Sequence, residues 1–522
     1  MPSDVQRPVS TALADNTDTR LGQAVAARAK AATTRNDSGF ALVGTADLAF
    51  TSRMTLIHAA QKTLDLQYYA IHADATTERL FDALKQAASR GVRVRILLDD
   101  FNTSGENAQI LKSAFEPNVE MRLFNPLPSS RGSGLWRIVS SLSDAARLQR
   151  RMHNKLFVAD NAVAITGGRN LGDTYFGQSD GVNFVDMDVL AAGRIVRDLS
   201  SSFDQYWNNP LAYPVQALIS KRDIEALKPQ LADPAAAPDA LNKTTLTRIA
   251  VDPTGLTTTI AALPDSTDLR LLSWTWAGAT LLVDKPSKIA EDADATEAAN
   301  STTVDGLLSL MARATADLLV VSPYFVPGPK MMKQFADIRQ RGVRVRVLTN
   351  SLASNDAVAA HAGYARYREG LLAMGVEIYE MRSEQRGTVF GSGGGFSAGS
   401  GSGSGSAGRS GGASRTSLHA KAVVVDNRLL VVGSMNLDLR SKLQNSEVAV
   451  AIRNRKLANE ATALIEPSLT SGAYRVEMVG GQLIWRAPQG SGLPDSTTEP
   501  DASLGLKLLV KAIAPFAPDE ML

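Results

Sequence analysis

The chain has 522 residues, which is enough for two to four domains of ordinary size. Hydrophobic residues make up 44% of the sequence and charged residues 21%, the profile of a globular protein with a large buried core. Lysine and arginine (55) nearly balance aspartate and glutamate (53), and this net charge of +2 argues against a dedicated nucleic-acid-binding protein. The chain has no cysteine, which excludes disulfides, thiolate nucleophiles and cysteine-ligated zinc.

The N-terminal segment, residues 1–40, is polar and lacks the apolar stretch of a signal peptide. We expect this segment to be flexible. No run of about 18 apolar residues occurs in the sequence, so no membrane-spanning helix is expected.

Two parts of the chain repeat the same predicted elements. The sequence RGVRVRILLDD begins at Arg90 and RGVRVRVLTN begins at Arg341, and each follows a helical stretch. Each repeat predicts a helix, a glycine at its end, and then a strand of alternating β-branched residues. Asp65 and Asp317 occupy equivalent points further upstream, each at the start of a strand that ends in aromatic residues. These repeats divide the chain into two similar halves.

Helices alternate with strands in both halves, which predicts layered α/β domains. We expect a first domain over 41–212 and a second over 301–470, packed as a pseudo-dimer within one chain. Residues 213–300, rich in Pro, Ala, Asp and Thr, predict a connecting segment with little regular structure. The Gly/Ser-rich stretch 391–415 predicts a surface loop of the second domain, and residues 471–522 form a C-terminal extension.

The end of this extension, SLGLKLLVKAIAPFAPDEML, has apolar residues at helical spacing together with Lys507 and Lys511. It fits either an amphipathic anchor at a membrane surface or a helix docked on the domain. The docked helix is the more ordinary interpretation.

The stretch RMHNKLFVADNAVAITGGRN recurs 266 positions later as SLHAKAVVVDNRLLVVGSMN. Each copy places a His and a Lys two residues apart, an Asp five residues after the Lys, and an Asn 17 residues after the His. The matched residues are His153, Lys155, Asp160 and Asn170 in the first copy, and His419, Lys421, Asp426 and Asn436 in the second. In a strand, residues i and i+2 point to the same face, so the His and Lys of each copy point together.

This set of side chains suits a phosphodiester. The Lys ammonium and Asn amide groups supply donors for the non-bridging oxygens and for the charge that develops in the transition state. One imidazole can attack phosphorus, while the other protonates the leaving alcohol and then deprotonates the incoming one. No carboxylate cluster with metal-ligand spacing occurs, so we expect no metal and no other cofactor.

Two copies of HxKxxxxD, each followed by a Gly-rich turn and an Asn, resemble the phospholipase D superfamily. From about residue 40 onward the chain is similar to the bacterial cardiolipin synthases, most of all to their C-type, through stretches such as LDLQYYAIHAD, RLFNP, SPYFVPG and HAGYARYREGLLAMGVEIYE. The resemblance implies a transfer through a phosphohistidine. We assign His153 as the nucleophile and His419 as the acid/base, and the pseudo-symmetry leaves the reverse assignment open.

The resemblance also implies that a downstream acidic residue orients each motif His, as the third member of a triad does. In the second half this residue is Glu447. Its counterpart in the first half is Asp186, with Asp188 as the alternative. We expect Asp160 and Asp426 to hold the motif loops rather than to contact substrate.

The two copies differ in their turns, GGRN and GSMN. The resemblance implies that Ser434 contacts the phosphate of the substrate. Its partner in the first half is Gly168, so that half must do without this contact or use Arg169.

The resemblance implies a phosphatidyl transferase that forms cardiolipin from phosphatidylglycerol and a second phospholipid, and a possible helper protein. Such an enzyme would be peripheral on the cytoplasmic side of the inner membrane, with phospholipid substrates at the membrane surface. A hydrolytic phospholipase D that releases phosphatidic acid needs the same residues, so the motifs leave it open. The near-neutral charge disfavours a nucleic-acid phosphodiesterase, and no nucleic-acid partner is expected. Intact motifs in both halves disfavour a non-catalytic membrane scaffold.

Overall fold

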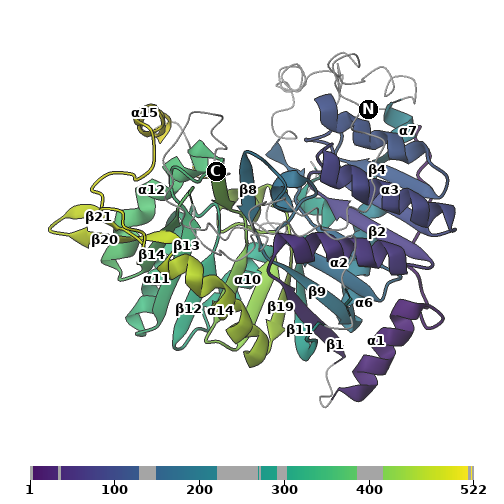
Figure 1. Ribbon diagram of the computed structural model, residues 1–522, viewed down its shortest axis with the longest axis horizontal. Helices are drawn as coiled ribbons and strands as arrows, with labels where there is room; N and C mark the ends of the chain where they lie inside the picture. The colour runs from purple at the N-terminus through teal and green to yellow at the C-terminus, as the bar shows by residue number, and fades with distance from the viewer. Residues whose placement is uncertain are drawn as a thin grey trace, which may run out of the picture.

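The computed structural model describes residues 4–32, 37–127, 149–219, 268–269, 272–290, 302–384, 415–514 and 519. Its two halves lie side by side, the first drawn in purple to blue and the second in green to yellow (Figure 1). Each half is a mixed sheet covered by helices, so the predicted α/β class is confirmed. The predicted Gly/Ser-rich loop lies, except for Arg415, outside the described residues.

The sheet of the first half contains β1 (Ser38–Val43), β2 (Thr63–Tyr68), β3 (Arg93–Asp99), β4 (Val119–Phe124), β6 (Leu156–Ala159), β7 (Val163–Gly167), β9 (Asp188–Gly193) and β10 (Ala212–Pro214). The strand order is β10–β4–β3–β2–β6–β7–β9–β1, in which β2, β3 and β4 are parallel and the other pairs antiparallel. Its helical elements are α2 (Ala46–Ala59), α3 (Ala75–Ser89), η1 (Gly105–Phe115), η3 (Asp173–Tyr175), α6 (Arg194–Trp207) and α7 (Val215–Leu218).

The second half repeats this plan with β12 (Asp317–Val321), β13 (Arg344–Asn350), β14 (Glu377–Met381), β16 (Ala422–Val425), β17 (Leu429–Gly433), β19 (Val448–Arg453), β20 (Ala473–Val479) and β21 (Gln482–Arg486). The strand order is β19–β17–β16–β12–β13–β14–β20–β21, with β12, β13 and β14 parallel. Its helices are α10 (Thr303–Met311), α11 (Gly328–Gln340), α12 (Val358–Ala373), α13 (Leu439–Leu443), α14 (Arg455–Thr470) and α15 (Leu504–Ile513).

The RGVRVR repeats adopt the predicted helix–glycine–strand structure. Gly91 and Gly342 have φ angles of 92° and 79°, a left-handed conformation that glycine adopts without a steric penalty. The second arginine of each strand meets the upstream aspartate on the neighbouring parallel strand. Arg95 Nε lies 2.6 Å from Asp65 Oδ1, and Arg346 Nη2 lies 2.9 Å from Asp317 Oδ2. The repeated Asp and Arg thus pin neighbouring strands together, once in each half.

Strand β11 (Thr275–Val283) joins the two sheets. Its first three residues pair with β1, and its last six pair with β19. The prediction of little regular structure over 213–300 is therefore wrong for this part of the segment. A strand of sequence TWAGATLLV carries a β-propensity signal, but its Pro- and Asp-rich surroundings obscure it. Most of 220–271 and all of 291–301 lie outside the described residues.

The N-terminal residues are ordered where the structure describes them. Helix α1 (Arg20–Ala31) begins after Thr19, whose side chain accepts a hydrogen bond from the Gly22 amide. Further upstream, the Ser10 carbonyl accepts a hydrogen bond of 2.9 Å from Arg95 Nη1. The prediction of a flexible 1–40 segment is therefore wrong for these residues, because they supply hydrogen-bond partners to the body of the first half.

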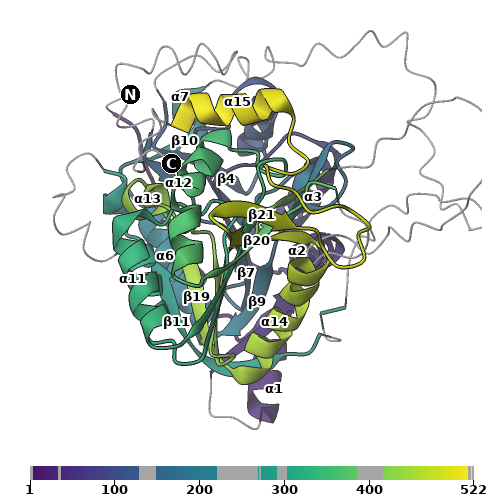
Figure 2. The ribbon, with the colours of Figure 1, turned by 90° about the vertical axis from the view of Figure 1, so that its left-hand side faces the viewer.

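A shared hydrophobic core lies between the two sheets. It contains Leu199 and Phe203 of α6, Leu457 and Ile465 of α14, and inward-facing strand residues of both halves. Separate outer cores lie under α2 and α3 in the first half and under α10, α11 and α12 in the second. From one side to the other, the layers are therefore outer helices, a sheet, the shared core with α6 and α14, a second sheet and outer helices. Figure 2 shows the second half face on. The shared core makes the two halves one structural unit.

The C-terminal extension completes the second half. Strands β20 and β21 add to the edge of its sheet next to β14, and α15 lies against α12 (Figures 1 and 2). None of the helices in the described part of the chain combines the length and the apolar character needed to cross a bilayer.

Candidate active site

Two short parallel strand pairs connect the halves at the His motifs. Strand β5 (Arg151–Met152) pairs with β18 (Asn445–Ser446), and β8 (Val182–Val185) pairs with β15 (Arg415–Leu418). In the first pair, Met152, just before His153, is aligned with Ser446, just before Glu447. In the second pair, Leu418, just before His419, is aligned with Val185, just before Asp186. The two chain segments therefore deliver a His and an acid side by side.

The resulting contacts cross from one half to the other. His153 Nδ1 lies 2.9 Å from Glu447 Oε2, and His419 Nδ1 lies 2.7 Å from Asp186 Oδ2. The prediction that each acid serves the His of its own half is therefore wrong, although both acids were identified. The alternative, Asp188, pairs with Arg53 at 3.0 Å. Because Nδ1 of each ring meets a carboxylate, Nε2 is the nitrogen that can attack or transfer a proton.

The motif lysines lie beside the histidines. Lys155 Nζ donates to the His153 carbonyl at 2.8 Å, and Lys421 Nζ donates to the His419 carbonyl at 2.6 Å. Burial lowers the pKa of Lys155 to about 7 and the pKa of Lys421 to about 8, against the opposing charges of Glu447 and Asp186. A bound phosphodiester anion would favour the charged form of both.

The two His–acid pairs differ in their electrostatics. Burial and the charges of Lys155 and Lys421 hold the pKa of His153 well below its usual value. Burial also lowers the pKa of His419, but there Asp186 acts in the opposite direction. Burial raises the pKa of Glu447 to about 7. At Asp186 burial is outweighed, mainly by His419, and its pKa falls to about 2. His419 thus faces an ionised carboxylate, whereas Glu447 is close to half-protonated at neutral pH.

The two asparagines hold different positions. Asn170 Nδ2 donates to the Tyr175 hydroxyl at 2.9 Å, and the Tyr175 ring lies 5.2 Å from the His419 ring, centroid to centroid. Asn170, in the first half, therefore holds the tyrosine ring that lies against His419, in the second half. Asn436 is buried, and its Oδ1 has no hydrogen-bond partner among the described residues. A buried acceptor of this kind is available to a donor of the substrate.

Comparison with known proteins finds the same family in both halves. A family model described as "Cardiolipin synthase, PLD-like domain" matches residues 54–207 and 307–467, one match in each half and together more than half of the chain. The chain belongs to this family. The chain is thus a phosphatidyltransferase of the phospholipase D type, and the family and enzyme class expected from the sequence are confirmed.

Relatives cover most of the chain. Cardiolipin synthase C of Escherichia coli K12 is 36% identical over 412 residues, which are 78% of this chain and 80% of that protein. An uncharacterized protein of Helicobacter pylori strain 26695 is 30% identical over 461 residues, 88% of this chain and 85% of that one. The crystal structure of phosphatidylserine synthase from Haemophilus influenzae superposes with a TM-score of 0.57 at 12% identity, covering 92% and 95% of the two chains. This last match shows the shared two-domain fold.

The motif aspartates hold the loops of this phospholipase D-like enzyme, as predicted. Asp160 accepts hydrogen bonds of 2.8–3.2 Å from the backbone amides of 61–63, and Asp426 accepts bonds of 2.7–3.1 Å from those of 315–317. Both aspartates have positive φ angles, 49° and 52°. Their carboxylates tie the motif hairpins to β2 and β12, so they are not among the groups that could touch substrate.

Ser434 does not contact substrate in the way predicted. Its hydroxyl bonds to Glu447 Oε2 and accepts from the Val448 amide, and the side chain is fully buried. Ser434 therefore orients the carboxylate that orients His153. In the first half, a Cβ on Gly168 would overlap Asp186 Oδ1, so a serine has no room there. The difference between the GGRN and GSMN turns follows from this crowding.

Arg169 is also wrongly predicted as a substrate contact. Its guanidinium is fully buried and donates to the carbonyls of Asp186, at 2.6 Å, and of Tyr175, at 3.3 Å. It lies 3.4 Å from Asp188. Arg169 therefore supports the segment that carries Asp186.

Several further residues shape the site and were not identified from the motifs. Ser441 Oγ donates to Glu447 Oε1 at 2.9 Å, and the Glu447 amide donates to Asp284 Oδ2 at 2.9 Å. Phe184 lies 5.0 Å from the His419 ring. The Tyr69 ring lies 5.0 Å from the His153 ring, centroid to centroid. Only Ser441 follows the motif closely enough in the chain for a sequence signal to suggest it.

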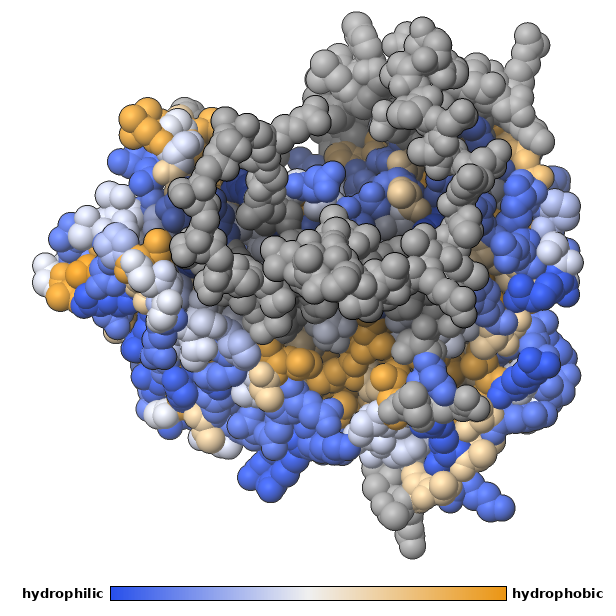
Figure 3. All heavy atoms as spheres, viewed as in Figure 1, coloured by the Kyte–Doolittle hydropathy of each residue, from blue (hydrophilic) through white to orange (hydrophobic). Residues whose placement is uncertain are grey.

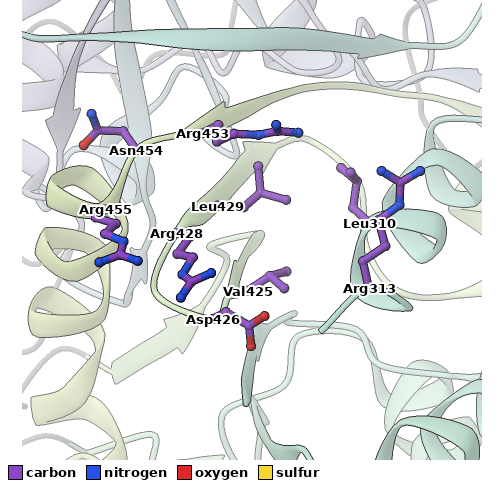
Figure 4. Close-up of a pocket in the computed structure, with 9 residues that line it drawn as sticks. All are labelled: Leu310, Arg313, Val425, Asp426, Arg428, Leu429, Arg453, Asn454 and Arg455. Carbon is purple, nitrogen blue, oxygen red and sulfur yellow. The ribbon is translucent and has the colours of Figure 1, made fainter. Parts of the chain in front are cut away.

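No group of three or more His, Asp or Glu side chains in the described ranges is arranged to hold a metal ion. A cavity of about 350 Å³ lies at the turn between β16 and β17. This turn is at the opposite end of β16 from His419, which precedes the strand. Arg313, Arg428, Arg453 and Arg455 stand around it with Asp426 (Figure 4). It contains no motif His or Lys, so it is separate from the candidate active site.

Proposed function

We propose that this enzyme transfers a phosphatidyl group from one phospholipid to a hydroxyl group of another and so forms cardiolipin from phosphatidylglycerol and a second phospholipid. The observation that carries the proposal is the pair of crossed His–carboxylate contacts, flanked by two buried lysines. This arrangement offers one imidazole for attack, one for proton transfer and two cations for the phosphate. The kinship with cardiolipin synthase C supports the choice of lipid substrates.

In the first step, His153 Nε2 attacks the phosphorus of the donor lipid. A P–N bond forms, the P–O bond to the leaving alcohol breaks, and protonated His419 gives its proton to that alcohol. His153 suits the nucleophile because its depressed pKa keeps the ring neutral, with its lone pair free. His419 suits the acid because ionised Asp186 stabilises an imidazolium.

In the second step, His419 takes the proton of the acceptor hydroxyl. The acceptor oxygen attacks phosphorus, the P–N bond breaks, and neutral His153 is restored. Lys155 and Lys421 stabilise the negative charge on the non-bridging oxygens in both steps. Water in place of the acceptor lipid would give phosphatidic acid by the same route.

The test uses vesicles of labelled phosphatidylglycerol and phosphatidylethanolamine, with the products identified by mass spectrometry. Wild-type protein is expected to form cardiolipin, and His153→Ala is expected to form none. Phosphatidic acid as the only product would make the enzyme a hydrolase. Cleavage of a short DNA strand, with no lipid product, would overturn the proposal.

A further inference from the structure

Helix α15 turns an apolar face outward. Leu504, Leu508 and Leu509 are 74%, 58% and 46% exposed, and no residue of the helix is buried. A spacing of four residues puts Leu504 and Leu508 about 40° apart around the helix axis, and Leu509 extends the exposed apolar arc to about 140°. Figure 3 shows this apolar surface at the upper left of the molecule, over α15. A surface helix normally presents polar residues to water, so this face is the reverse of the usual pattern.

The opposite face of α15 is docked on the second half. Ile513 packs against Val326, and so do Ala359 and Tyr367 of α12. The chain leading into the helix is held at Glu499, whose Oε1 accepts a hydrogen bond of 2.7 Å from Arg368 of α12. Docking therefore accounts for the inner face of α15 and leaves the three leucines uncovered by the described residues.

The position of α15 relates this face to the active site. Helix α12 follows the end of β13 at which the motif segments meet. Just before α12, Asp356 accepts a hydrogen bond of 2.8 Å from Tyr324, and its negative charge offsets part of the lowering of the Lys421 pKa by burial. Ile513 packs against the same Val326 as Ala359, which lies three residues beyond Asp356. The exposed face of α15 thus lies at the same end of the second half as the histidines.

We propose that the outer face of α15 docks the enzyme on an anionic phospholipid bilayer. Leu504, Leu508 and Leu509 would enter the interfacial region, and Lys507 and Lys511, on the adjoining flank, would meet lipid phosphates. This inference rests on the proposed function, because docking at this end presents the active site to lipid head groups. A face of three leucines is too small for a stable protein interface, which needs about 800 Å² per partner.

The experiment measures co-sedimentation with vesicles of phosphatidylcholine and phosphatidylglycerol. The test variant is Leu504→Ser/Leu508→Ser/Leu509→Ser. The control is Met478→Ser/Val479→Ser, which removes apolar residues that are also exposed, on β20 away from the site. The test variant is expected to bind vesicles about tenfold or more weakly, and the control as wild type. Thermal unfolding of both variants checks that they are folded.

A second substrate separates docking from chemistry. With monomeric short-chain phosphatidylglycerol, wild type and the leucine variant are expected to have the same turnover, because no surface is required. Equal vesicle binding by both proteins would overturn the inference. Loss of a dimer in the leucine variant, with vesicle binding unchanged, would assign the face to a second copy of the chain. Normal docking without conversion of any phospholipid would instead refute the proposed function.

The lysines give an independent readout. Lys507→Gln/Lys511→Gln is expected to weaken binding to phosphatidylglycerol vesicles and to reduce its salt dependence, since surface charges near anionic lipid are screened by salt. Binding to pure phosphatidylcholine vesicles is expected to be unchanged. An unchanged salt dependence would contradict the role of these lysines.

Discussion

His153 Nδ1 meets Glu447 Oε2 at 2.9 Å across 294 positions of sequence, from one half of the molecule to the other. The reciprocal contact, between His419 and Asp186, spans 233 positions. Neither half therefore contains a complete His–acid pair. The shared core and the bridging strand β11 are what hold each pair together. The active site is a property of the assembled pseudo-dimer.

Asp186→Asn and Glu447→Gln are expected to differ in their pH dependence. Asp186 is ionised at all ordinary pH values, so its replacement removes support for the His419 imidazolium and is expected to lower kcat about 10³-fold. Glu447 has a pKa of about 7, so glutamine resembles its protonated form below pH 7. The loss of kcat in Glu447→Gln, relative to wild type, is therefore expected to grow from pH 6 to pH 8. Parallel profiles of kcat against pH for the two variants would contradict this difference between the two acids.

The assignment of nucleophile and acid predicts different trapping behaviour. A phosphatidyl ester of p-nitrophenol has a leaving group that needs no proton. His419→Ala is therefore expected to give a burst of nitrophenol and a phosphohistidine detectable by mass spectrometry. His153→Ala is expected to give neither. The opposite result would exchange the two roles.

The motif residues could be predicted from sequence because their spacing is local. The two-residue step from His to Lys fixes the face of the strand, and the glycine in each RGVRVR repeat fixes the turn after a helix, each within one stretch of chain. The crossed acid contacts could not be predicted in this way. They depend on strand pairs of two and four residues between distant segments, β5 with β18 and β8 with β15. Pseudo-symmetry makes the same-half and cross-half pairings equally compatible with the sequence.

The substrate contacts assigned to Ser434 and Arg169 failed for a related reason. The family resemblance implied the phosphate contact of Ser434, with Arg169 as its substitute in the first half. In the structure the Ser434 hydroxyl bonds to the Glu447 carboxylate and Arg169 bonds to the Asp186 carbonyl. The one relevant sequence signal is Gly168, because a glycine in one repeat at the position of a serine in the other indicates crowding at that position.

Gly168→Ala is expected to disable the enzyme through Asp186. The added methyl would overlap Asp186 Oδ1 and move the carboxylate away from His419. A 1 Å displacement of this kind is expected to cost about 10²-fold in kcat. Gly181→Ala is the matched control, since its Cβ would come no closer than 3.7 Å to another side chain. Equal activity of both variants would show that Asp186 has room to adjust.

The alkaline limb of kcat/KM is expected to report the motif lysines of the free enzyme. Lys155 and Lys421 must be protonated to bind the phosphate anion, and their pKa values are about 7 and about 8. Activity is therefore expected to fall as pH rises through this range and to be retained below it, down to the pH at which protonation of the nucleophile His153 governs the acid limb. Lys155→Arg, with a side chain that stays charged, is expected to lower the maximum but to shift the alkaline limb upward. If the alkaline limb of Lys155→Arg falls at the same pH as that of wild type, the limb reports the titration of a group other than Lys155.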